Sequence, residues 1–228
     1  MLNTAFTTVA ALALWFSGIF FQAVAPAAFP RDGARQLIDN PRVTVWDVAW
    51  TKGRAVPMHR YADDTVVVAL AATPLKITMA DGTSKTADLK VGDMVFWPKG
   101  TTQSEEAGAD GRTIMTNLKD FKVDPIANKT SYGLAFPRPR VRKLLENDRI
   151  IGWDYTWVAG EPTPTHFHDK DVVLTYVAAG ALKSTTPDGR VTPNAFTFGE
   201  TRFNLRDRTH FEEYVSGNGP RAMIMELK

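Results

Sequence analysis

The chain has 228 residues, of which 44% are apolar and 23% charged, so it is long enough to bury one large core or two small ones. Its formal net charge of +2 is too small to indicate nucleic acid as a partner, and we expect none. The absence of cysteine excludes disulfides, thiolate metal sites and thiol nucleophiles.

The chain begins with an apolar segment. No Asp, Glu, Lys, Arg or His precedes Arg31, and the run from Ala5 to Ala25 is almost wholly apolar. About 20 such residues span a bilayer as a helix, whereas a secretory signal peptide has a shorter apolar region after basic residues. We therefore predict a membrane-anchoring transmembrane helix over residues 1–27. A signal peptide cleaved near Ala25-Pro26-Ala27 and a buried core helix are the alternatives.

The next part of the chain is predicted to be β-structure. Residues 43–50, 65–70, 75–79 and 93–97 are short segments in which apolar and polar residues alternate, with many β-branched side chains. The Asp81-Gly82 pair is typical of a hairpin turn, because glycine accepts positive φ. Regular short strands with Gly or Pro between them, and no long helical period, indicate an all-β sandwich or barrel.

The second half of the chain repeats the first. Residues 35–47 return as residues 142–154, an offset of 107. The match holds without gaps between residues 28–106 and 135–213, with 28 identities over 79 aligned positions. The stretch between the copies contains Pro125, Gly133, Pro137 and Pro139, which suits a linker. We predict a first unit at 28–119, a linker at 120–140 and a second unit at 141–228.

Two motifs of the second copy carry a resemblance to a known family. Gly160-Glu-Pro-Thr-Pro-Thr-His166-Phe-His168 is similar to the first cupin motif, and Phe198-Gly199-Glu200 followed by His210 is similar to the second. With both copies aligned, the chain resembles a bicupin. The resemblance implies an all-β fold of two tandem antiparallel, jelly-roll-like cupin barrels, each with a site inside. Cupins include metal-dependent dioxygenases, isomerases, sugar-binding modules and storage proteins, so the fold does not determine the function.

The same motifs predict a metal site in the second barrel. Residues two apart on a strand face the same way, so His166 and His168 can both point inward, as can His210 and Glu212. Three imidazoles and one carboxylate suit one divalent Fe, Mn, Ni, Cu or Zn ion. The glutamate that cupins usually carry after the second histidine is replaced by valine, so Glu212 is our own candidate. The alternative is a relic of an ancestral site that holds no metal.

The first barrel is expected to hold no metal. Its counterparts of the four candidate ligands are His59, Tyr61, Gln103 and Glu105, and Tyr61 and Gln103 are poor ligands for a transition metal.

A basic run lies at the start of the second copy. It is interpreted as a solvated linker face, or alternatively as a contact with lipid head groups or an acidic partner, and consists of Arg138, Arg140, Arg142 and Lys143.

Two functions follow from these features. The favoured one is a single-pass, membrane-anchored, non-catalytic accessory subunit whose barrels dock on other subunits of a respiratory or photosynthetic type of membrane complex. We place the barrels on the periplasmic side. Arg31 and Arg35 after the apolar run weakly oppose this under the positive-inside rule, but long domains are exported largely regardless of charge. The alternative is a metal-dependent bicupin enzyme, an oxidoreductase such as a dioxygenase or an isomerase, that uses the second-barrel histidines. No catalytic residue and no other cofactor site is identified.

Overall fold

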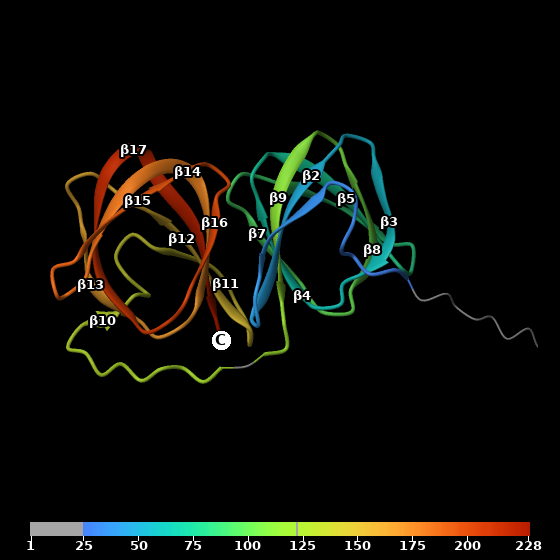
Figure 1. Ribbon diagram of the computed structural model, residues 1–228. Coiled ribbons are helices and arrows are strands. Elements are labelled where there is room, and N and C mark those ends of the chain that lie inside the picture. Colours follow the sequence, from blue (N-terminus) through green and yellow to red (C-terminus); the bar gives the residue numbers. More distant parts are fainter. Residues whose placement is uncertain (1–24, 122) are drawn as a thin grey trace, which may run out of the picture.

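The computed structural model describes residues 25–121 and 123–228, which form strands and no helix (Figure 1). Within these residues, no helix has the length and hydropathy of a membrane span. The predicted anchor over residues 1–27 lies outside the described residues except for its last three, so it stays a prediction.

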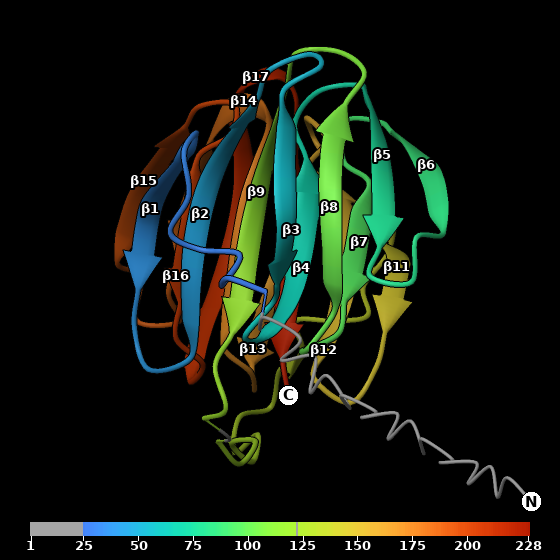
Figure 2. The same cartoon turned by 90° about the vertical axis from the view of Figure 1, so that its right-hand side faces the viewer.

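The N-terminal barrel consists of two facing antiparallel sheets (Figure 2). One sheet has the order β1-β2-β9-β4-β7 and the other the order β3-β8-β5-β6. The predicted strands at 43–50 and 65–70 correspond to β2 and β4, because alternating side chains let one face of each strand be buried. The bounds are β1 Ala34–Asp39, β2 Val43–Trp50, β3 Ala55–Arg60, β4 Asp64–Ala69, β5 Thr73–Met79, β6 Ser84–Leu89, β7 Met94–Trp97, β8 Thr102–Ala107 and β9 Gly111–Leu118.

In the C-terminal barrel two long strands, β14 and β17, each contribute to both faces of the barrel. The first part of β14 pairs with β16 and with the end of β17, and its second part pairs with β15 and with the start of β17. In the N-terminal barrel these long strands are each divided in two, as β4 and β5 and as β8 and β9. The bounds are β10 Gly133–Leu134, β11 Arg142–Glu146, β12 Ile150–Thr156, β13 Thr163–His168, β14 Val172–Thr185, β15 Val191–Phe196, β16 Thr201–Asn204 and β17 Arg208–Leu227.

Both halves have the same strand order, as the sequence repeat predicts. The order β1-β2-β9-β4-β7 of the first half has its counterpart in β11-β12-β17-β14-β16 of the second. Each half also buries its own aromatic core, around Trp50 and Tyr61 in one and around Trp157 and Tyr176 in the other. The described residues thus form two similar barrels that lie side by side (Figure 1).

A third apolar cluster joins the two barrels. It combines side chains of β2, β4 and β9 with side chains of β12, β14 and β17, all of them buried. Burying such side chains stabilises by about 1.5–3 kcal/mol each relative to exposure, so the barrels form one packed unit. The members are Val43, Val45, Val66, Val68, Leu70, Ile114 and Leu118 of the first barrel, and Ile150, Val173, Val177, Met223, Met225 and Leu227 of the second.

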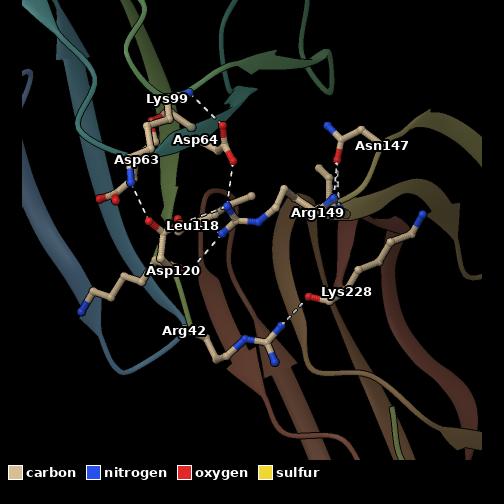
Figure 3. A network of polar contacts seen from close by, with 12 residues as sticks. Arg42, Asp63, Asp64, Lys99, Leu118, Asp120, Asn147, Arg149 and Lys228 are labelled. Atoms are coloured by element: carbon tan, nitrogen blue, oxygen red, sulfur yellow. Dashed lines mark hydrogen bonds and ion pairs between the residues drawn. The ribbon is translucent and has the colours of Figure 1, made fainter. Parts of the chain in front are cut away.

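Reciprocal arginine contacts flank this cluster. Arg42 of the first barrel pairs with Asp171 of the second at 3.1 Å. Their counterparts in the repeat, Arg149 and Asp64, pair in the opposite direction at 2.8 Å. Figure 3 shows Arg149 reaching Asp64 and Arg42 reaching the backbone carbonyl of Lys228 at the same junction. Each barrel thus supplies the arginine of one pair and the aspartate of the other, which indicates a two-fold relation between the barrels.

Candidate metal centre

Two adjacent strands bring three histidines together inside the C-terminal barrel. On β13, His166 and His168 alternate with Phe167 and so lie on the same face of the strand. On β17, His210 lies directly opposite His166 in the antiparallel register. The potential ligand atoms of the three rings all lie within 4.8 Å of one another. Three of the predicted ligands therefore converge.

The ring nitrogens of this triad are suited to hold an ion. Nδ1 of His166 donates to the carbonyl oxygen of Pro164 at 2.8 Å, so its Nε2 carries a lone pair. Within the described part of the chain, Nε2 of His166, both ring nitrogens of His168 and Nε2 of His210 are buried without a hydrogen-bond partner. Buried polar atoms are normally satisfied, so this concentration of unpartnered nitrogens fits a bound metal ion.

Burial keeps the imidazoles of His166 and His168 neutral, which is the form that binds a metal ion. It lowers the pKa of His166 from 6.5 to about 4, even though the nearby Glu212 carboxylate acts in the opposite direction. Burial, reinforced by the positive charge of Arg208, also holds the pKa of His168 well below 6.5. Both imidazoles are therefore neutral near pH 7, as metal binding requires.

Glu212 lies beside the triad and makes contacts of its own. Its Oε2 accepts a hydrogen bond from Trp157 Nε1 at 3.1 Å and lies 3.4 Å from Nη1 of Arg138. Its Oε1 lies 3.5 Å from Nε2 of His210. Burial raises the pKa of Glu212, but His210 and Arg138 outweigh this and hold it well below 4.5. The carboxylate is ionised, and its role as a fourth ligand stays a prediction.

A cavity of about 280 Å³ adjoins the histidines. His168, His210 and Glu212 line it together with three arginines, Arg138, Arg202 and Arg208. Hydroxyl and amide side chains line it as well, alongside aromatic and aliphatic ones, which is typical of a small-molecule site. The polar members are Ser184, Thr186, Thr192, Asn194 and Asn204.

The corresponding place in the N-terminal barrel is a hydrogen-bond network around Glu105, in which Nε2 of His59 is the only imidazole nitrogen left without a hydrogen-bond partner among the described residues. Oε1 of Glu105 accepts hydrogen bonds from Tyr61 at 2.8 Å and from Gln103 at 2.7 Å, while Arg31 donates to Oε2 at 3.0 Å. His59 keeps the contact with a proline carbonyl that its counterpart His166 makes. Tyr61 and Gln103 stand where the second barrel has histidines, so no triad forms there among the described residues.

The interpretation of the basic run as a solvated face is wrong for Arg138. Its side chain is only 8% exposed, and its guanidinium lies over the rings of Tyr155 and Phe136 while it pairs with Glu212. The sequence contains a signal for this role, because Arg31 is the counterpart of Arg138 in the repeat. In the structure Arg31 pairs with Glu105, and Arg138 pairs with its counterpart Glu212. Arg208 is a second cavity residue that the motifs did not reveal.

No protein-family model matches the sequence, and no curated protein matches it. Solved structures do match the fold. A cupin 2 conserved barrel domain protein from Leptotrichia buccalis has a TM-score of 0.54 at 14% identity, over 86% of this chain and 88% of that one. AerE from Microcystis aeruginosa has a TM-score of 0.60 at 8% identity, over 90% of this chain and 99% of that one.

Oxalate decarboxylase from Bacillus subtilis, a protein with Mn(II) centres, matches with a TM-score of 0.59 at 9% identity. The match covers 85% of this chain and 74% of that one. At these identities the likeness shows the fold alone, and the described chain has the cupin fold.

Proposed function

We propose that the C-terminal barrel binds one divalent transition metal and that the protein is a metal-dependent enzyme, an oxidoreductase or an isomerase, acting on a small molecule. The observation that carries the proposal is the convergence of buried, unpartnered nitrogens of His166, His168 and His210, of which His168 and His210 line a cavity. Fe, Mn, Ni, Cu and Zn all accept imidazole ligands. The Mn(II) centres of oxalate decarboxylase, a protein with the same fold, agree with this reading.

Residues around the proposed metal centre have different roles. A bound metal would act as a Lewis acid toward an oxygen of the substrate. The Pro164 carbonyl orients His166 through Nδ1. Because its pKa is held low, Glu212 is a weak base, and its charge is better used to balance the cations around it than to remove a proton.

Metal analysis of the purified full-length protein tests the proposal. We expect about one ion per chain after reconstitution, with the melting temperature raised by the ion. His210→Gln should lose that ion, since it removes one of the three ligands. His59→Gln is the matched control, because His59 makes the same proline contact in the barrel without a triad. A reconstituted wild-type protein without metal, or a His210→Gln variant that binds as tightly, would overturn the proposal.

The membrane-anchored accessory role is a second proposal, and it rests on the apolar run Ala5 to Ala25. It includes a periplasmic location for the barrels and other membrane-complex subunits as partners. Deleting residues 1–27 should release a folded protein from the membrane fraction and separate it from any partner subunits. A full-length protein that fractionates with soluble proteins, and whose mature chain begins near Ala28, would contradict it.

A further inference from the structure

Among residues 25–121 and 123–228, one of the three arginines that line the cavity has no acidic partner. Arg138 pairs with Glu212, and Arg202 pairs with Glu200. Arg208 forms no ion pair within the described part of the chain, and its only hydrogen bond there runs from Nε to the carbonyl oxygen of Leu205 at 2.6 Å. The two terminal nitrogens of its guanidinium therefore have no hydrogen-bond partner among the described residues, and Arg208 lines the cavity.

The position of Arg208 is fixed by the same strands that hold the histidines. It lies two residues before His210 on β17, so both side chains share one face of the strand, and it is paired with His168 in the register of β13. The acidic groups around it are committed elsewhere: Glu212 contacts Arg138, and Asp171 accepts from Arg42 and from the backbone of Arg206. The half-buried Arg208 thus lies on the strand of His210 and opposite His168, without an ion-pair partner among the described residues.

The duplicated barrel supplies an internal comparison. The counterpart of Arg208 in the N-terminal barrel is Thr101, and that of Ser184 in the cavity wall is Ile77. Ile77 is buried in the apolar core of its barrel. The uncompensated arginine and the polar cavity wall therefore occur together with the triad in one barrel and are both missing at the matching positions of the other.

We infer that the ligand of this cavity is a small organic carboxylate, one carboxylate group of which is bound by Arg208 next to the metal centre, an inference that rests on the proposed function. The planar guanidinium matches a carboxylate in two parallel hydrogen bonds. Arg208 is the one cavity arginine without an ion-pair partner among the described residues, so the cavity offers one such two-bond site for a carboxylate group. The cavity of about 280 Å³ suits a small ligand. Trp157 and Tyr176 offer rings to an apolar body.

The test measures binding of two acids and of their uncharged amides to full-length protein in detergent by calorimetry, with and without metal. The probes are acetate, benzoate, acetamide and benzamide. We expect at least one acid to bind tenfold or more tightly than its amide, and Arg208→Gln to abolish that preference. Arg190→Gln is the matched control, because Arg190 lies in an exposed hairpin of the same barrel.

Each outcome bears on the inference. If neither acid binds more tightly than its amide, or if folded Arg208→Gln keeps the preference, the inference is wrong. The acid–amide comparison on the wild-type protein stands even if the variant does not fold. Metal content measured on the same samples separates the two proposals. Protein that takes up no metal on reconstitution but still prefers the acid contradicts only the metal centre, and metal-loaded protein without the preference contradicts only the carboxylate site.

Discussion

Acidification of the metal-free protein should destabilise it through His166. Burial lowers the pKa of this ring from 6.5 to about 4, so between these values the unfolded chain binds a proton that the folded chain does not. The contribution of His166 is fully present above pH 6.5 and is lost as the pH falls to about 4. The difference in pKa corresponds to about 3 kcal/mol of unfolding free energy. His168 acts in the same direction.

Urea denaturation in the presence of EDTA, from pH 7.5 to 4.5, measures this loss. His166→Gln removes the titrating group while keeping a similar volume, so subtracting its curve from that of the wild type isolates the ring. The wild type should lose up to about 1.4 kcal/mol more per pH unit than the variant below pH 6.5. Parallel curves for the two proteins would show that the ring is not held neutral by burial, and the account of His166 as a preformed ligand would fail.

Three further predictions concern stability, and urea denaturation tests each of them. Arg42→Met leaves the buried carboxylate of Asp171 without its cation and should cost about 3 kcal/mol, and a loss below about 0.5 kcal/mol would contradict the role given to this pair. Gly33→Ala should cost about 1–3 kcal/mol, because φ is +76° there and a Cβ would lie 2.9 Å from a carbonyl oxygen of β2; an unchanged midpoint would refute the strain. Trp153→Phe removes the 2.8 Å hydrogen bond to buried Glu226 and should also cost about 1–3 kcal/mol of unfolding free energy; a variant as stable as the wild type would contradict this.

The features that depend on local sequence pattern were predictable. The alternation from Val43 to Trp50 corresponds residue for residue to β2. The internal repeat predicted equal strand order in the two halves, because equivalent patterns of strands and turns fold in the same way. The period of two along a strand also placed His166 and His168 on one face, and the structure brings them to His210.

Features that depend on closure of the barrels were not predictable. Arg138 follows a proline-rich stretch and looks solvated in sequence, yet its partner Glu212 is 74 residues away. The pair Arg42 and Asp171 spans 129 residues and exists only because the barrels dock. Arg208 belongs to no sequence motif, and it stands out only because the acidic residues near it pair with other arginines. Such contacts are set by tertiary packing, which local pattern does not encode.

The reciprocal contacts between the barrels make the chain equivalent to a symmetric dimer whose two subunits are joined by a tether. Such a tether keeps the partner at an effective concentration in the millimolar range, so the pair does not separate on dilution. The shared surface is built from one set of side chains on β2, β4 and β9 and on their counterparts, whereas each barrel encloses a separate core. Substitutions inside one barrel therefore leave the shared surface intact. One half is free to act as a permanent scaffold while the other diverges chemically, which is a division of labour that an assembly of two identical chains does not permit.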